Sequence, residues 1–128
     1  MLPPEYVRRD VPAQMAVVDR GRLALLVLEG GHAFLMRARD ALERGDLRSF
    51  ASDLGRTRDV FLEVSQTIDD AQGGDIAASV GRLHQLMVSR LALANAERAL
   101  ALVDEVLRAY VPIIDSYRQI VTHTTTPA

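Results

Sequence analysis

The residue pair best suited to binding a metal ion is Glu29 and His32, because one helical turn would place the two side chains side by side. In helical bundles, two such Glu-x-x-His pairs on facing helices, together with two further glutamates, hold a pair of iron or manganese ions. A second pair is missing, because the residue three positions before His84 is Gly81. Three histidines in the whole chain also leave too few ligands. We therefore expect no metal site, and we interpret a histidine here as a surface or partner-facing residue.

Three other patterns could support chemistry, and none is complete. The acidic run 69–75 lacks the alternating ligands, central glycine and closing glutamate of a calcium loop, so we predict a turn there, with Asp75 capping the next helix. The serines are scattered, without the glycine-flanked turn that exposes a nucleophile. The Gly30-Gly31 pair follows no strand, so it favours close helix approach over phosphate binding. The sequence thus indicates neither an enzyme nor a cofactor.

Composition restricts the class of protein further. The chain has 128 residues, 48% of them hydrophobic, which predicts a single globular domain with a core of its own. It has no cysteine, which excludes disulfides and thiolate metal sites. Its 15 basic and 17 acidic residues include no basic block, so we expect no binding to nucleic acid. The apolar run 23–28 is too short to insert into a membrane, and no apolar signal peptide precedes it, so we expect a cytoplasmic protein.

Apolar residues three and four positions apart, interrupted by glycine and polar clusters, predict four helices. Their expected ranges are 22–43, 46–68, 76–94 and 98–121. Gly45 is suited to the left-handed position after the first helix, residues 95–97 can break the chain before the fourth, and Pro112 should kink it. No segment alternates as a strand does, and short connections make successive helices antiparallel. The predicted fold is therefore all-α, an antiparallel up-down four-helix bundle.

We divide the chain into a bundle of residues 20–121, an N-terminal segment and a tail. Residues 1–19 form the N-terminal segment, which can contain a short helix after Pro12. Residues 122–128 have nothing to bury, so we expect a disordered tail.

Each predicted helix carries an apolar stripe for the core. The stripe of the second helix contains Leu47, Phe50, Leu54, Thr57, Phe61, Val64 and Ile68. That of the third contains Ile76, Val80, Leu83, Met87, Leu91 and Ala94. That of the fourth contains Leu100, Val103, Leu107, Tyr110, Ile114, Tyr117 and Val121.

The first helix carries more apolar surface than a bundle needs. Its expected inner stripe is Leu23, Val27, Gly30, Phe34, Ala38 and Ala41. Roughly opposite, at 100° per residue, lies a second stripe of Leu25, Leu28, His32, Leu35 and Met36. The fourth helix repeats this more weakly with Leu102, Val106, Ile113 and Ile120. Either the N-terminal segment covers the extra surface through residues such as Tyr6 and Val7, or the surface binds an amphipathic helix of another chain. Both interpretations are true if the N-terminal segment is a lid that the partner displaces.

Two stretches resemble the flagellin export chaperones, the FliS family. Residues 73–95, GGDIAASVGRLHQLMVSRLALAN, are similar to the family pattern GGEIA…L..LY.YM..RL..AN. Residues 23–35, LALLVLEGGHAFL, resemble the first-helix pattern L..MLYDGA..FL, and the run ALERGD at 41–46 resembles the Gly-Asp turn that ends that helix. Leu28, His84 and Leu86 stand where the family patterns have tyrosine, and Tyr117 replaces the usual tryptophan. The resemblance covers about residues 20–121.

The resemblance implies a cytoplasmic chaperone that is not an enzyme and needs no cofactor. Such a chaperone binds the disordered C-terminal region of flagellin, prevents its premature polymerisation and helps deliver it to the flagellar export apparatus. We expect the flagellin helix to lie in a groove lined by Leu25, Leu28, His32 and Leu35, with Tyr6 and Val7 in the lid. The protein would be a monomer or weak homodimer. A self-associating helical-bundle adaptor, burying the same stripes in a homodimer, is the alternative.

Overall fold

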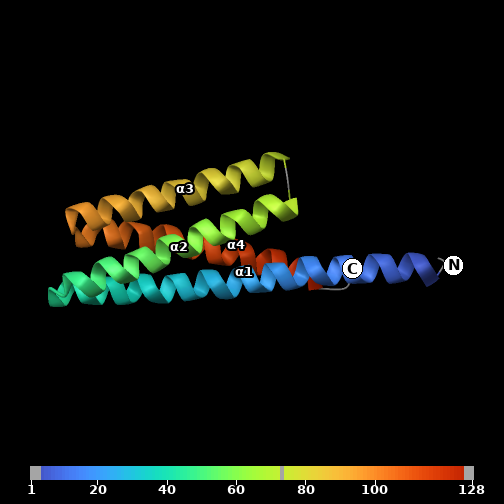
Figure 1. Ribbon diagram of the computed structural model, residues 1–128, viewed down its shortest axis with the longest axis horizontal. Helices are drawn as coiled ribbons and strands as arrows, with labels where there is room; N and C mark the ends of the chain where they lie inside the picture. The colour runs from blue at the N-terminus through green and yellow to red at the C-terminus, as the bar shows by residue number, and fades with distance from the viewer. Residues whose placement is uncertain (1–3, 73, 126–128) are drawn as a thin grey trace.

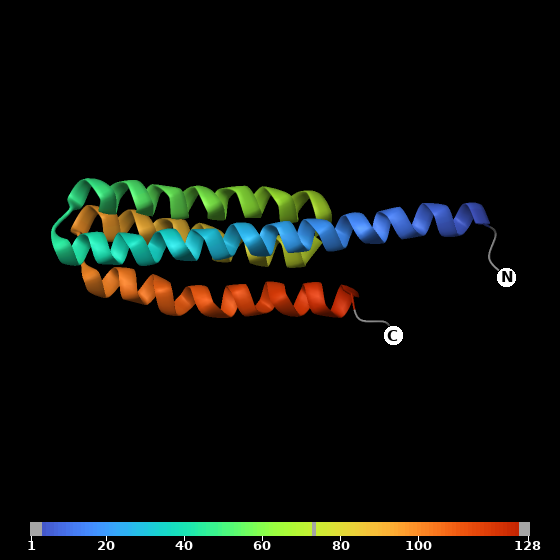
Figure 2. The same cartoon turned by 90° about the horizontal axis from the view of Figure 1, so that it is seen from below.

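A computed structural model describes the backbone of residues 4–72 and 74–125, and the side chains of residues 20–66, 81–119 and 121. It contains four helices, α1 (Pro4–Arg44), α2 (Leu47–Gln72), α3 (Gly74–Glu97) and α4 (Leu100–Thr125). Successive helices run in opposite directions, and both chain termini point to the same end of the bundle (Figure 1, Figure 2). The predicted all-α, up-down four-helix bundle is confirmed.

The helices are longer than predicted at several ends. α1 begins at Pro4, so most of the predicted N-terminal segment is the first part of α1, which continues beyond the ends of the other helices (Figure 2). α2 and α3 extend into the predicted loop at 69–75, and α4 extends into the predicted tail as far as Thr125. α1 continues through Pro12 and Gly21, two residues of the types that often mark a helix boundary. The tail has no glycine, and no proline before Pro127, so the usual signals that end a helix are missing where we placed the end of α4.

The helices form a ring in which α1 packs against α2 and α4, and α3 packs against the same two. Side chains from diagonally opposite helices meet at the centre, where the ring centroids of Phe61 on α2 and Tyr110 on α4 lie 4.9 Å apart. From α1 and α2 the buried core takes Ala24, Leu28, Leu35, Ala38, Ala41, Phe50, Leu54, Phe61 and Val64. From α3 and α4 it takes Met87, Leu91, Ala94, Val103, Val106, Tyr110, Ile113, Ile114 and Tyr117.

The turn between α1 and α2 forms as predicted. Gly45 has a φ of 77°, and its N–H donates to the carbonyl of Leu42 at 3.1 Å. The N–H of Asp46 donates to the carbonyl of Ala41 at 2.8 Å, which completes the usual glycine-ended helix terminus. The Asp46 carboxylate then accepts a hydrogen bond from the N–H of Ser49 at 3.2 Å, so it caps α2.

The turn between α3 and α4 lies later than predicted. Residues 95–97 do not break the helix, because α3 continues through Glu97. The chain instead reverses at Arg98, whose φ is 52° and whose N–H donates to the carbonyl of Ala94 at 2.8 Å. Glycine usually occupies this left-handed position, so an arginine there gave no sequence signal. Pro112 lies inside α4, as expected.

The predicted orientation of the two α1 stripes is wrong for residues 23–35, whereas Ala38 and Ala41 are buried and Met36 is exposed as predicted. Leu28 and Leu35, assigned to a partner-binding groove, are both 0% exposed and belong to the core. Leu23, assigned to the core, is 60% exposed, and Val27 and Phe34 are only half-buried. Direct contact between a partner and Leu28 or Leu35 would therefore require the bundle to open.

Gly31 explains which side of α1 faces inward. A Cβ atom at this position would clash with the Tyr110 hydroxyl and lie 2.9 Å from Cγ1 of Val60. The missing side chain thus allows side chains of α2 and α4 to approach the α1 backbone closely at Gly31. The carbonyl of Gly31 also accepts a hydrogen bond from the Thr57 hydroxyl at 3.2 Å. These contacts turn the stripe containing Leu28 toward the core.

Candidate functional site

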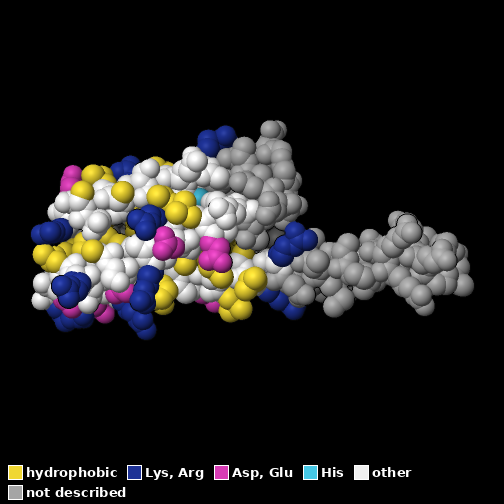
Figure 3. All heavy atoms as spheres, viewed as in Figure 1, with side chains coloured by type: hydrophobic (Ala, Val, Ile, Leu, Met, Phe, Trp, Pro, Cys, Tyr) yellow, Lys and Arg dark blue, Asp and Glu magenta, His cyan; other side chains and the backbone are white. Residues whose placement is uncertain are grey.

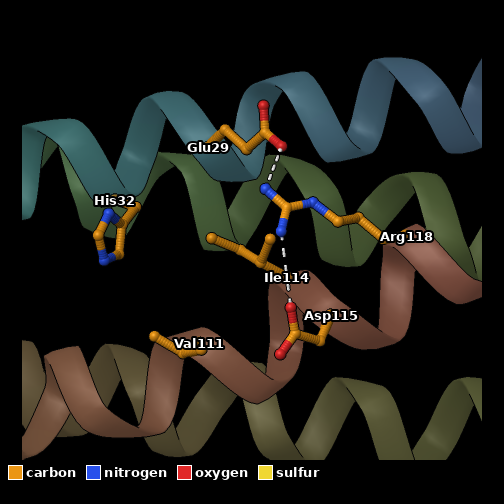
Figure 4. A pocket seen from close by; sticks show the side chains of 6 residues that line it. All are labelled: Glu29, His32, Val111, Ile114, Asp115 and Arg118. Carbon is orange, nitrogen blue, oxygen red and sulfur yellow. Dashed lines mark hydrogen bonds and ion pairs between the residues drawn. The ribbon is translucent and has the colours of Figure 1, made fainter.

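A pocket of about 230 Å³ opens between α1 and α4 (Figure 4). Glu29 and His32 line it from α1, and Val111, Ile114, Asp115 and Arg118 line it from α4. Val111 is 50% exposed, whereas Ile114 is almost buried, so the two supply an apolar wall that the solvent reaches. A space of this size fits one side chain of a partner rather than a whole helix.

Charged groups border one end of this pocket, and His32 borders the other (Figure 4). The Arg118 guanidinium donates to Oε1 of Glu29 across the helix interface at 3.1 Å. It also lies 3.6 Å from Oδ1 of Asp115 on its own helix. All three side chains are well exposed, so these ion pairs position the groups more than they stabilise the fold.

Fixed aromatic contacts hold the inner wall of the pocket. The His32 ring meets the Tyr110 ring edge-on, with centroids 5.3 Å apart. Tyr110 donates its hydroxyl hydrogen to the carbonyl of Leu28 at 2.6 Å. Burial raises the pKa of the Tyr110 hydroxyl well above its usual value, which keeps it in the donating form. The wall beneath His32 is therefore preorganised.

A second apolar surface lies along α3. Leu83, Leu86 and Leu93 are 41%, 52% and 38% exposed, and their spacing places them on one side of the helix. Arg90 falls on the same side, and its Nε lies 3.9 Å from Oε1 of Glu105 on α4. We call these three leucines the α3 stripe, and the Arg90 contact shows that the stripe faces the α4 side of α3.

The α3 stripe corrects the core expected for this helix. Leu83, predicted to lie in the core, is 41% exposed. His84, which the predicted core stripe did not include, is buried, with its Nδ1 atom 2.7 Å from the Ser65 hydroxyl and its ring centroid 5.5 Å from that of Phe61. The sequence did contain the signal, because His84 precedes Met87 by three positions and extends the buried series to Leu91 and Ala94, while Leu83, Leu86 and Leu93 form a series of their own.

The predicted groove residues do not gather at one site. Leu25 is half-buried and packs against the core, and His32 lines the α1–α4 pocket. Leu28 and Leu35 lie inside the bundle. Tyr6 and Val7 fall within α1, but their side chains lie outside the described residues.

The described residues contain neither a cluster of metal-binding side chains nor a helix that could span a membrane. In the part of the chain that the structure describes, no three His, Asp or Glu side chains converge as metal ligands would. None of the helices, over the residues described, is both long and apolar enough to span a bilayer. The chemistry available at both surfaces is apolar contact bordered by ion pairs, which suits binding to a protein segment.

Comparison with protein families identifies the chain's relatives. A family model described as flagellar protein FliS matches residues 4–124, nearly the whole chain. The chain belongs to the FliS family. The match includes both the pocket and the α3 stripe.

Individual FliS proteins are similar to this chain over most of its length. The flagellar secretion chaperone FliSB of Pseudomonas aeruginosa is 29% identical over 102 residues, which cover 80% of this chain and 81% of that protein. The flagellar secretion chaperone FliS of Salmonella typhimurium is 25% identical over 116 residues, covering 90% and 86%. That of Vibrio cholerae is 22% identical over 115 residues, covering 90% and 85%.

Three positions where this chain departs from the FliS tyrosine pattern lie in different environments. Leu28 and His84 are buried, so these departures change the core of the bundle. Leu86 is 52% exposed within the α3 stripe, so this departure changes the surface. A leucine lacks the hydroxyl group of tyrosine, which makes the α3 stripe of this FliS protein purely apolar.

Proposed function

We propose that this FliS protein is a flagellar export chaperone that binds the disordered C-terminal region of flagellin. The flagellin segment folds as an amphipathic helix along the α3 stripe, and binding prevents premature polymerisation. The observation that supports this proposal best is the exposure of Leu83, Leu86 and Leu93 on one side of a helix whose adjacent side is buried in the core. Monomeric proteins rarely leave such an ordered apolar row uncovered without a partner.

The spacing of the α3 stripe suits a helical partner. The leucines of the α3 stripe are three and seven positions apart, and apolar residues at such helical spacing on a partner helix can interdigitate with them along a shared seam. Fully burying an exposed leucine contributes about 1.5–3 kcal/mol, so covering the partly exposed leucines of the α3 stripe contributes about half of that each, whereas ordering the segment costs about 2–5 kcal/mol. Folding a disordered segment on this surface therefore requires burial of the segment's own apolar side chains as well.

The α1–α4 pocket supplies a second anchor in this proposal. It holds one apolar side chain of the bound segment against Val111, Ile114 and His32. Leu25, half-buried on the same helix as His32, supports the wall through its contact with the core. Of the four groove residues expected from the sequence, Leu25 and His32 are thus the two that keep a role at the surface.

The proposal also includes the lid and the cellular role that the family resemblance implies. Tyr6 and Val7 belong to the lid, and covering the bundle with them requires α1 to bend, because its first part continues away from the bundle (Figure 2). The chaperone acts in the cytoplasm and passes flagellin to the flagellar export apparatus.

Light-scattering mass and circular dichroism, measured with and without a C-terminal flagellin fragment from the same organism, test this proposal. We expect a one-to-one complex and a rise in helicity larger than the sum of the separate components. A chain that stays a monomer and does not bind the fragment would refute the proposal. A dimer indifferent to the fragment would instead identify the self-associating adaptor.

A further inference from the structure

Two arginines from different helices share one aromatic ring on the α1–α2 side of the bundle. The guanidinium carbon of Arg37 lies 5.7 Å from the ring centroid of Phe34, one turn earlier on α1. That of Arg56, on α2, lies 5.2 Å from the same centroid. Phe34 is half-buried and both arginines are exposed, so the ring holds two cationic groups at the surface.

Neither arginine has an anionic partner among the described residues. Asp40 on α1 and Asp53 and Asp59 on α2 lie three positions from one of the two arginines, but Asp59 forms its ion pair with Arg58, and neither Asp40 nor Asp53 forms one with Arg37 or Arg56. No carboxylate of the described part lies within ion-pair distance of Arg37 or Arg56. Each guanidinium can therefore form charge-assisted hydrogen bonds with a carboxylate that a partner supplies.

An apolar row leads along α1 to this pair of arginines. Leu23, Val27, Gly30 and Phe34 are separated by four, three and four positions, so they lie on one side of the helix. Leu23 is 60% exposed, and a Cβ atom built on Gly30 would meet no atom within 4 Å. Figure 3 shows hydrophobic side chains at the surface along α1, near the start of the described side chains. The row offers an open shelf at Gly30 where another backbone can approach.

We propose that this α1–α2 surface binds an amphipathic helical segment with acidic side chains at one end of its apolar row. The segment's apolar side chains pack along Leu23, Val27 and the open Gly30, and its carboxylates bind Arg37 and Arg56. The unpaired positive charge at one end of the row selects an acidic partner and fixes the direction of the bound helix. This surface lies on α1 and α2, so it is separate from the α3 stripe and can be occupied independently of flagellin.

A synthetic peptide of defined composition tests the proposal. The probe is a fluorescein-labelled helical peptide with leucines four, three and four positions apart and two glutamates in the turn beyond the last leucine. The control peptide carries glutamine in place of both glutamates. By fluorescence anisotropy at low ionic strength, we expect the full-length protein to bind the glutamate peptide about tenfold more tightly, equivalent to about 1.4 kcal/mol.

A variant pair assigns the difference to the two arginines. The double variant Arg37→Gln with Arg56→Gln should bind both peptides with the weaker affinity. The control is Arg22→Gln with Arg108→Gln, which removes the same charge from exposed arginines on α1 and α4 and should preserve the preference. Equal affinity of the native protein for the two peptides, no binding of either peptide, or an unchanged preference in the Arg37 and Arg56 variant would each refute the proposal.

A parallel measurement separates this proposal from the proposed function. The same variants are titrated with the C-terminal flagellin fragment. Loss of the peptide preference together with intact flagellin binding is the result we expect for two independent surfaces. Loss of flagellin binding in the Arg37 and Arg56 variant would contradict the independence of the two surfaces.

Discussion

Tyr110 on α4 donates a hydrogen bond from its hydroxyl group to the backbone carbonyl of Leu28 on α1, over 2.6 Å. Leu28 and Tyr110 are both fully buried, and they come from opposite ends of the sequence. This bond joins the first and last helices at the level of the α1–α4 pocket. It therefore connects the stability of the bundle to the shape of a surface that we propose binds flagellin.

The two buried tyrosines of α4 should respond differently to loss of the hydroxyl group. Tyr110→Phe removes a buried hydrogen bond and should lower the free energy of unfolding by about 1 kcal/mol. Tyr117→Phe should be neutral or stabilising, because the Tyr117 hydroxyl is buried with no partner among the described residues. Urea unfolding followed by circular dichroism measures both. An equal loss in the two variants would contradict the assigned hydrogen bond.

The adjacent glycines of α1 form a second matched pair. Gly31→Ala should destabilise the protein by about 1–3 kcal/mol, because the new Cβ overlaps the Tyr110 hydroxyl and Val60. Gly30→Ala has open space around it and should stabilise the helix by up to about 1 kcal/mol. The midpoints of thermal unfolding of the two variants should thus move in opposite directions. A Gly31→Ala protein as stable as the native one would show that α1 does not approach its neighbours as closely as described.

The orientation of α1 could not be predicted from periodicity alone. Two apolar rows lie on nearly opposite sides of the helix, one containing Leu28 and the other Leu23, and both are regular. The inward side is decided by the fit of Gly31 against Tyr110, a residue 79 positions later in the chain. Such a contact between distant residues leaves no local pattern. The predicted groove therefore included two core residues, Leu28 and Leu35.

Helices and turns that are determined by residues close in the sequence could be predicted. The four helices follow from apolar spacing, and the turn at Gly45 follows from the conformational freedom of glycine, whereas the cap that Asp46 provides for α2 was not predicted. The same reasoning failed at Arg98, a residue that rarely adopts a positive φ. The α3 stripe is an intermediate case, because its spacing is visible in the sequence but the predicted core stripe included Leu83 and left out His84.

The ion pair between Arg39 and Asp104 should make stability depend on pH. The Arg39 guanidinium donates to Oδ1 of Asp104 at 2.6 Å and joins α1 to α4. This hydrogen bond lowers the pKa of Asp104 below its usual value. A carboxyl group with a lowered pKa in the folded state stabilises the protein above its unfolded-state pKa, and this contribution disappears as pH falls through the folded-state pKa.

Arg39→Gln should therefore destabilise the protein at neutral pH, and this effect should begin to fall at about pH 4, the usual aspartate pKa, and disappear as pH falls through the lowered pKa of Asp104. Urea unfolding of the native protein and of the variant across this range measures the difference. In an Asp104→Asn background, Arg39→Gln should have only the small effect that comes from its contact with Glu43. A difference that stays constant down to acid pH would exclude Asp104 as the titrating group.

The most direct test of the proposed function compares two exposed leucines as sites for the same substitution. Leu86 lies in the α3 stripe and is 52% exposed, and Leu26 lies on α1, outside that stripe, and is 65% exposed. Isothermal titration with a C-terminal flagellin fragment should show that Leu86→Asp weakens binding about tenfold or more, while Leu26→Asp leaves it within about twofold. Both variants should keep the native helicity. Undiminished flagellin binding by a folded Leu86→Asp protein would contradict our assignment of the α3 stripe.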